Sequence, residues 1–358
     1  MWSQKGFLLL ILFSLLAFDK NIFAEERIFI LPLQFNYYHL TSARELSLGE
    51  IYQADKSQFL SSSGGENPQI SLGISYLSPT QSHNKVQTKN SLASPGFFAL
   101  DVPLKNIDLS IIYHLLYKAN ISFYPSFLDT SGSISIDQFI LNVHELGLSV
   151  SSLVTPNLGV YGCLSYVKSE SYWWHRGELV AKGFPQGFGF SGLTRLGISD
   201  ELWLSVGMST RRILKGYSDR LLPDGTKLGF EGTVPQKTFA SISYQLEEDF
   251  RAFFQVVMTG WQVTSWNYSA RTDFHGGIEI EVIPQKFWVR FGGFTLYHPI
   301  DEEVRIENSH LRDQFFFTTG IGFIKKPFEF NLGFGTSRIF SKGCLSQERG
   351  AVTMTMEL

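Results

Sequence analysis

Cysteine is nearly absent from this chain, which has only two among its 358 residues, Cys163 and Cys344. Two cysteines cannot build the disulfide framework that holds many small exported domains together. They lie far apart in the sequence and pair only if neighbouring strands bring them together. The sequence alone does not decide whether they pair. Interactions other than disulfide bonds must therefore stabilise most of the fold.

Long apolar runs and catalytic motifs are missing as well. After the N-terminus, no stretch approaches the about 18 consecutive apolar residues of a membrane-spanning helix. The chain has no Gly-x-Ser-x-Gly, no His-Glu-x-x-His, no Cys-x-x-Cys and no phosphate-binding P-loop. We therefore expect no enzyme, no metal site and no cofactor. The net charge of −3 argues against a nucleic-acid partner, which would require a basic face.

The N-terminus has the layout of an export signal. Lys5 supplies a positive charge, Gly6 to Phe18 is an uncharged apolar run, and Ala24 precedes the charged Glu25. The apolar run is shorter than a spanning helix requires, so residues 1–24 are predicted to be a signal peptide that is removed. A single membrane anchor is the alternative. No Cys follows the run, which argues against a lipid anchor.

Phenylalanine and glycine are abundant, at 32 residues each, and apolar residues alternate with polar ones along the chain. Successive residues of a strand point to opposite faces, so each such segment has one apolar face. In an exported chain with few cysteines, this pattern is typical of a membrane barrel whose apolar face meets lipid. The clearest alternating sets are Phe250, Ala252, Phe254, Val256; Phe274, Ile278, Ile280, Val282; Phe328, Phe330, Leu332, Phe334; and Val352, Met354, Met356, Leu358.

Alternation and turn signals predict an all-β fold: a transmembrane antiparallel β-barrel of about 14 strands over 69–358, with 12 as the alternative. Short links near 155–157, 199–200, 247–248, 284–285 and 326–327 are expected at the periplasmic end. Long links at 78–92, 119–132, 218–234 and 298–311 are expected outside. The predicted strands are 69–77, 93–103, 107–118, 133–153, 157–174, 179–199, 201–217, 235–246, 249–265, 272–283, 286–297, 312–324, 327–340 and 349–358.

The segment between the signal peptide and the barrel, 25–68, does not read as a strand. Ser42 to Leu48 has the pattern of one or two helical turns, and the rest of 40–68 is mostly small and polar. Such a segment is either a disordered periplasmic tail or a plug inside the barrel. A barrel of about 14 strands is wide enough to leak unless its interior is filled.

These residues carry a resemblance. Ser42-Ala43-Arg44, Leu48-Gly49, Ala54-Asp55, Ser57 and the small-residue turn ending at Gly64 resemble the N-terminal hatch of the FadL/TodX family of outer-membrane transporters for long-chain fatty acids and other hydrophobic compounds. The order of pieces around Pro235, Trp261 and Trp288–Gly293 is also similar. Ser61-Ser62-Ser63-Gly64 departs from the family's Asn-Pro-Ala-Gly turn. The resemblance implies a plugged barrel with hatch residues Ala43, Arg44, Leu48, Gly49, Asp55, Ser57, Phe59 and Gly64.

Strand alternation also assigns residues to the lumen. Glu279 or Glu281 is predicted to face Arg290 across a hairpin, and such pairs either brace the wall or leave an arginine for an anionic head group. Aromatic positions at Tyr172–His175 and Trp261–Trp266 are predicted to lie in the interfacial girdle. The candidate ligand-binding residues are Arg251, Phe253, Trp288, Arg290 and Phe316.

These patterns and the resemblance together predict a monomeric, multi-pass barrel in the outer membrane of a diderm bacterium. Its partners are expected to be hydrophobic small molecules, membrane lipids and the barrel assembly machinery. The expected function is passive transport of hydrophobic compounds such as long-chain fatty acids. The alternative is an interaction protein, such as a secretion-system shuttle barrel or an adhesin, that binds proteins through its outer loops. An ordinary porin is a third possibility, and open-channel conductance would identify it.

Overall fold

The structure, a computed structural model, describes residues 27–29, 42–48, 67–83, 86–89, 92–105, 107–123, 137–175, 178–221, 227–260, 270–297, 314–339 and 345–358. Several predictions lie outside the described residues. They are the signal peptide 1–24, the hatch positions Gly49, Asp55, Ser57, Phe59 and Gly64, the aromatic segment 261–266, the long link 298–311 and Cys344.

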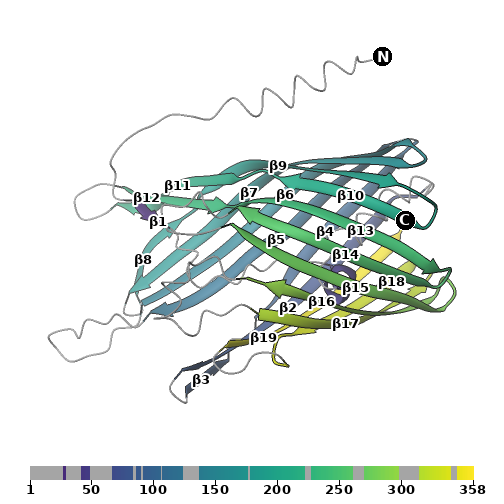
Figure 1. The fold of residues 1–358 in the computed structure, drawn as a ribbon. Helices are drawn as coiled ribbons and strands as arrows, with labels where there is room; N and C mark the ends of the chain where they lie inside the picture. The colour runs from purple at the N-terminus through teal and green to yellow at the C-terminus, as the bar shows by residue number, and fades with distance from the viewer. Residues whose placement is uncertain are drawn as a thin grey trace, which may run out of the picture.

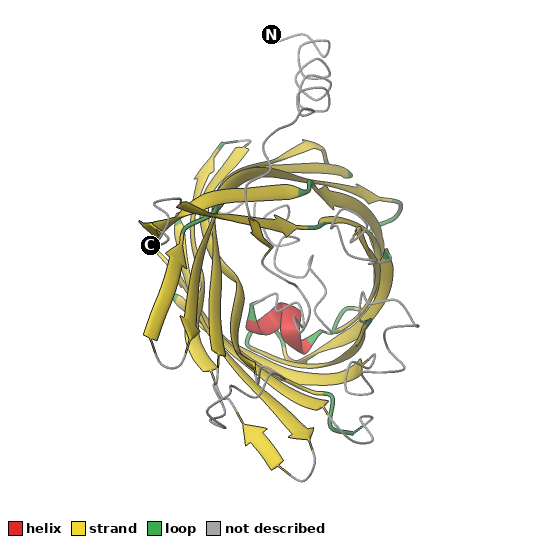
Figure 2. Cartoon of the chain, turned by 90° about the vertical axis from the view of Figure 1, so that its left-hand side faces the viewer, coloured by secondary structure: helices red, strands yellow, loops and turns green. Residues whose placement is uncertain are grey.

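The described strands form a closed antiparallel barrel of 14 crossings (Figures 1 and 2). Consecutive crossings pair along the chain, and the last crossing pairs with the first, with Val352 opposite Ile74. The short strand Arg27–Phe29 adds a parallel pairing with Gly229–Glu231. The strands are β1 Arg27–Phe29, β2 Gln69–His83, β3 Val86–Lys89, β4 Leu92–Leu104, β5 Ile107–Phe123, β6 Asp137–Thr155, β7 Leu158–His175, β8 Glu178–Gly183, β9 Gln186–Gly197, β10 Leu202–Ser209, β11 Arg212–Leu221, β12 Lys227–Val234, β13 Gln236–Glu247, β14 Phe250–Gly260, β15 Arg271–Ile283, β16 Phe287–Leu296, β17 Gln314–Lys325, β18 Phe328–Thr336 and β19 Leu345–Glu357.

Alternation sets which way each strand faces. On β18, Phe328, Phe330, Leu332 and Phe334 are exposed on the outer surface, whereas the intervening Asn331 is buried on the inside. The same contrast continues around the barrel, so its outside is an apolar belt. Soluble proteins rarely expose an apolar surface of this extent, and hydrocarbon is the environment that it suits.

Three crossings are interrupted at residues that the structure describes. The sequence analysis predicts continuous strands at two of these crossings and a loop followed by a strand at the third. β8 and β9 are separated at Pro185, β10 and β11 at Thr210, and β12 and β13 at Pro235. Proline has no N–H to donate to a neighbouring strand, which accounts for two of the breaks. The carbonyl of Pro185 still accepts a hydrogen bond from the Ser169 backbone N–H at 2.8 Å, so the β7 ladder continues past the break.

Three of the predicted long links are partly wrong. β2 continues to His83 and forms a hairpin with β3, β5 continues to Phe123, and 218–234 contains the end of β11 and all of β12. Beyond the hydrocarbon a strand needs no apolar face, so backbone pairing continues where the alternating pattern stops. The short links are confirmed as tight connections, and together they define the short-turn end of the barrel.

The described part of 42–68 contains one short helix, α2 (Ala43–Ser47), which lies inside the barrel against the wall formed by β16 to β19 (Figure 2). Ser42 caps it: its side chain accepts from the Glu45 backbone N–H at 3.2 Å, and the Glu45 carboxylate accepts in return from the Ser42 N–H at 3.4 Å. This reciprocal pair is a capping box, which favours helix formation in so short a segment. The predicted helical turn over Ser42 to Leu48 is confirmed.

No helix among the described residues is both long and apolar enough to cross a bilayer.

Candidate functional site

The α2 segment (residues 42–48, called the hatch segment below) is attached to the inner wall by its backbone. The Ala43 N–H donates to the Thr353 hydroxyl at 2.8 Å, and the Thr318 hydroxyl donates to the Ser47 carbonyl at 3.2 Å. Both threonines are buried on the inner wall, on β19 and β17. These bonds satisfy polar groups that a helix only five residues long leaves open at its ends.

Inward-facing glycines allow the hatch segment to approach this closely. At Gly277, Gly320 and Gly333, a Cβ atom would overlap the hatch segment, so any larger residue would push it from the wall. The contacts that such a Cβ would make are 2.5 Å to the Leu48 carbonyl oxygen at Gly277, 2.4 Å to the Ser47 Cβ at Gly320 and 2.4 Å to the Ala43 carbonyl oxygen at Gly333.

A buried ion network links the hatch segment to the wall. The Arg44 guanidinium donates two hydrogen bonds to the Glu279 carboxylate, at 3.1 Å from Nε and 3.0 Å from Nη2. Arg290 donates to the same carboxylate at 2.6 Å and to the Asn331 amide oxygen at 2.7 Å. The side chains of Arg44 and Glu279 are 6% and 4% exposed. One carboxylate thus holds two guanidinium groups out of solvent, an arrangement that needs all of these bonds to compensate desolvation.

The predicted pairing across the β15–β16 hairpin is confirmed for Glu279, which lies opposite Arg290. Glu281 lies opposite Trp288 instead. On its other side, Glu279 lies opposite Arg251 of β14, yet its carboxylate bonds to Arg44 and Arg290. Arg251 forms no ion pair with any described residue, and its side chain is exposed to the lumen.

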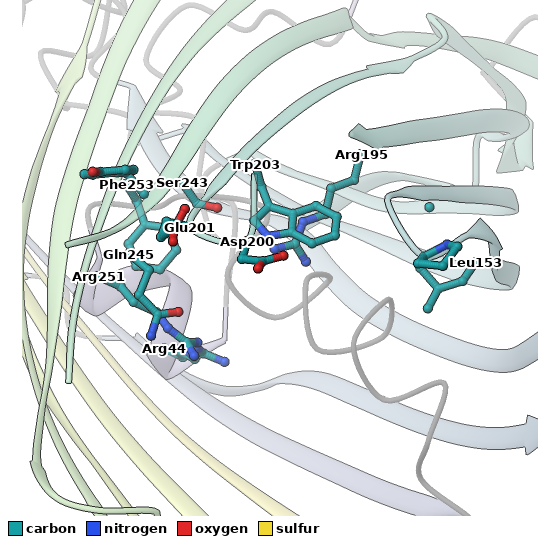
Figure 3. A pocket seen from close by; sticks show the side chains of 13 residues that line it. Arg44, Leu153, Arg195, Asp200, Glu201, Trp203, Ser243, Gln245, Arg251 and Phe253 are labelled. Carbon is teal, nitrogen blue, oxygen red and sulfur yellow. The ribbon is translucent and has the colours of Figure 1, made fainter. Parts of the chain in front are cut away.

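A cavity of about 440 Å³ lies beside the hatch segment at the short-turn end (Figure 3). Its walls come from the hatch segment, from β9 and β10 with their connecting turn, from β13 and β14, and from the end of β6. Cations, carboxylates and aromatic rings all contribute to the lining. The residues that give it this character are Arg44, Arg195, Glu201, Trp203, Arg251 and Phe253.

The charged groups of the cavity differ in how they are held. The Arg195 guanidinium lies over the Trp203 ring, 4.3 Å from its centroid, a cation–π geometry that fixes its position. Glu201 lies in the β9–β10 turn, where its carboxylate accepts a hydrogen bond from the Ser199 hydroxyl at 2.8 Å. That bond lowers the pKa of Glu201, so it is an anion at neutral pH.

Phe316 lies elsewhere on the inner wall, in a stack of rings. Its ring is parallel to that of Phe294 at 4.6 Å, and His275 continues the stack at 5.6 Å from Phe294. The Arg349 guanidinium lies 4.6 Å from the Phe316 ring centroid and 5.3 Å from that of Phe294, so it contacts both rings. Phe316 is fully buried, so its surface is covered by wall residues.

The wall formed by β6, β7, β9, β10 and β13 is lined by small hydroxyl groups around one apolar cluster. The cluster consists of Tyr161, Cys163 and Leu193, with Phe239 packed against it. This part of the lumen wall therefore combines polar hydroxyl groups with an apolar patch. The buried serines around the cluster include Ser149, Ser165, Ser205 and Ser241.

The structure brings together some predicted site residues and separates others. Arg251 and Phe253 line the cavity with Arg44, and Phe253 also packs against Leu48 of the hatch segment. Arg290 is buried in the ion network, and Trp288 is half-buried on the same strand face, outside the cavity lining. Phe316 belongs to the ring stack.

Sequence reasoning missed three cavity residues, Arg195, Trp203 and Glu201. Two signals were available. Arg195 lies in phase with inward-facing Leu193 on β9, and the Ser199-Asp200-Glu201 turn connects it to Trp203. Among the described residues, no group of three or more His, Cys, Asp or Glu side chains is arranged to hold a metal ion.

No family model and no curated protein sequence matches this chain. Solved structures do match it. The toluene transporter TodX of P. putida aligns with a TM-score of 0.65 at 10% identity, covering 89% of this chain and 98% of that one. A Pseudomonas aeruginosa FadL homologue aligns at 0.67 and 10% identity, covering 88% and 98%. The fold is that of FadL and TodX.

A third structure, the monoaromatic hydrocarbon channel CymD, gives a TM-score of 0.60 at 12% identity, covering 88% of this chain and 97% of that chain. The FadL/TodX-like fold predicted from the hatch residues and the strand pattern is therefore confirmed. At these identities the likeness establishes the fold, and side-chain chemistry has to be argued from this chain's own residues.

Proposed function

We propose that this chain is an outer-membrane channel that passes hydrophobic compounds, such as long-chain fatty acids, by diffusion without energy input. The observation that carries the proposal is a FadL/TodX-like barrel with a helix docked against its inner wall, beside a cavity lined by arginine and aromatic side chains. The names of the matched proteins, a toluene transporter and a FadL homologue, support a hydrophobic cargo.

The route has three stages. A molecule is captured at the external loops, enters the lumen, and leaves after a small movement of the hatch or sideways through the wall. Phe253, Trp203 and Leu153 offer apolar contacts near the short-turn end, and the arginines offer hydrogen bonds. Mainly apolar contacts with a few placed polar groups are typical of small-molecule sites.

The proposal extends to location and assembly. Residues 1–24 direct export, the assembly machinery inserts the barrel as a monomer, and the apolar belt contacts outer-membrane lipids. Because the short turns lie at one end, that end faces the periplasm in this arrangement.

A binding titration tests the function. The purified, refolded protein is titrated with a long-chain fatty acid and with a sugar as the matched control, and tryptophan fluorescence is recorded. Saturable binding of the fatty acid alone is expected. Equal binding of the sugar would indicate a general porin. If neither ligand binds, the transport proposal fails and the interaction-protein alternative is favoured.

Residues 40–68 are proposed to close the channel, and deletion tests this role. The variant lacking 40–68 is expected to conduct ions in a planar bilayer, whereas the intact protein insulates. Folding of the deletion variant is checked by its electrophoretic migration before and after heating. A folded variant that insulates as well as the intact chain would overturn the assignment of 40–68 as a plug.

A further inference from the structure

We infer that the cavity at the short-turn end binds the carboxylate of an anionic amphiphile through Arg251, and that the hatch segment keeps Arg251 available for this by holding Glu279 through Arg44. The inference rests on the proposed transport function and deepens it. It names the side chain that receives the head group of the cargo and the contact that keeps this side chain available.

The register of β14 and β15 places a cation opposite a carboxylate. Arg251 and Glu279 are direct cross-strand partners, and both side chains face the lumen. Opposite residues of an antiparallel pair have Cα atoms about 4.5–5.5 Å apart, so an arginine and a glutamate there normally form an ion pair. In this structure they do not.

The Glu279 carboxylate bonds to two other arginines instead. Oε2 accepts from Arg44 at 3.1 Å and from Arg290 at 2.6 Å, and Oε1 accepts from Arg44 at 3.0 Å. Arg290 belongs to the barrel wall and is present whatever the hatch does. Arg44 is the one partner that arrives with the hatch segment, so docking of the hatch takes Glu279 away from Arg251.

Two guanidinium groups, those of Arg251 and Arg195, line the cavity. Arg251 faces it with no ion pair to a described residue, and the Arg195 guanidinium lines the same space over Trp203. Planar guanidinium groups bind carboxylates through paired, charge-assisted hydrogen bonds. Phe253 and Trp203 provide apolar contacts for the first carbons of an alkyl chain.

Acidic groups also face this cavity. Asp200 and Glu201 lie on its rim, in the β9–β10 turn. They repel an anion, so binding of a carboxylate depends on the arginines. If these two residues dominated instead, the cavity would select a cationic amphiphile, and the experiment below includes that case.

Release follows from the same geometry. When the hatch segment leaves the wall, Arg44 leaves Glu279, whose carboxylate keeps Arg290 and has Arg251, its cross-strand partner on β14, to take the place of Arg44. Formation of that pair removes the head-group partner from the cavity, and the ligand loses affinity. Two events coupled in this way must be reciprocal: bound carboxylate stabilises the docked hatch as much as the docked hatch stabilises bound carboxylate.

The first test compares three ligands with one alkyl chain: dodecanoate, 1-dodecanol and dodecyltrimethylammonium. Each is titrated against the full-length protein in non-ionic detergent. Dodecanoate is expected to bind at least about tenfold more tightly than the alcohol, because hydrogen bonds to a charged group are among the stronger ones. In Arg251→Gln the advantage over the alcohol should disappear. Arg338→Gln, which changes an exposed arginine outside the cavity lining, is the matched control.

The outcomes separate the inference from the proposed function. If all three ligands fail to bind, the transport proposal fails. If dodecanoate and dodecanol bind equally, and Arg251→Gln changes neither, transport stands and the carboxylate site is overturned. Preference for dodecyltrimethylammonium would also overturn it and would assign selection to Asp200 and Glu201.

The second test addresses the competition for Glu279. Arg44→Gln should weaken dodecanoate binding about tenfold, because Glu279 then captures Arg251. Arg44→Gln combined with Glu279→Gln should restore binding, because no carboxylate is left to capture it. If Arg44 instead contacts the ligand directly, the double variant stays weak and the competition is overturned.

A third measurement avoids variants of the buried network, which can lose stability. Saturating dodecanoate should slow proteolysis of the segment before β2 in the wild-type protein. The same ligand should give no protection in Arg251→Gln, and dodecanol should give none in either protein. Equal protection of the two proteins by dodecanoate would contradict the coupling.

Discussion

Arg44 and Glu279 connect the N-terminal segment to the barrel wall through two parallel hydrogen bonds of 3.0 and 3.1 Å, between residues 235 positions apart in the chain. The pair is buried, and Glu279 holds Arg290 at the same time. Removal of Arg44 therefore leaves the carboxylate with a cation on the wall, while the hatch segment loses its only described ion pair to β15.

Arg44→Ala should release the hatch segment without unfolding the barrel. Breaking a buried ion pair by removing one partner costs about 3–5 kcal/mol, and here the loss falls on a helix of five residues. We expect faster cleavage before β2 by a protease added to the folded protein. Arg338→Ala is the control: its pair with Glu348 at 3.1 Å is partly exposed and contributes about 0–1 kcal/mol. Equal cleavage of both variants would show that the Arg44–Glu279 ion pair does not hold the hatch segment to the wall.

Gly277→Val should displace the hatch segment by steric overlap alone. A Cβ at Gly277 would lie 2.5 Å from the Leu48 carbonyl oxygen, so the backbone of the hatch segment must move. Gly276→Val is a matched control, because a Cβ there meets only the Phe253 carbonyl oxygen, at 3.8 Å. We expect a higher bilayer conductance for Gly277→Val than for the unchanged protein, and no increase for Gly276→Val. Conductance that rises in both would show that valine in this strand disturbs the wall itself.

The alternating pattern predicts which residues face the lumen but not which of them meet. Strand parity places Glu279, Arg290 and Arg251 inside because each strand has an apolar face that must meet lipid. The parity of a strand carries no information about contacts with a distant segment. The contact between Arg44 and Glu279 depends on the closed barrel, whose inward-facing glycines allow the hatch segment to lie against the wall.

Strand ends and cavity residues escaped prediction for a related reason. β12 lies in a stretch predicted to be a loop, because outside the hydrocarbon neither face of a strand has to be apolar. The contact between Arg195 and Trp203 depends on the β9–β10 register, in which Trp203 lies opposite Gly197 and its ring covers that glycine. A register of this kind is fixed by pairing in three dimensions.

Leu148→Arg should impair insertion much more than Val154→Arg. Both residues are on β6 and face outward, with 57% and 59% exposure, but Val154 lies next to the 156–157 turn. An arginine on the lipid face costs about 2–4 kcal/mol near the midplane and about 0–1 kcal/mol near an interface. The folded fraction in lipid vesicles over a urea series measures the difference. Equal losses would show that the outward face of β6 is not set across the bilayer as proposed.

Phe316→Ala should destabilise the barrel and leave ligand affinity unchanged. The ring is fully buried, stacked on Phe294 with Arg349 beside both rings, and truncation of a buried phenylalanine costs about 3–5 kcal/mol. Phe315→Ala is the control on the neighbouring, outward-facing position, which is 40% exposed and should lose about 1 kcal/mol. The urea midpoint in vesicles and the dodecanoate titration are measured on both variants. Sequence alternation assigned Phe316 to the ligand path, and a weakened titration with an unchanged midpoint would support that role. The structure predicts the reverse, because the Phe316 ring is fully buried among wall residues and exposes no surface to a ligand.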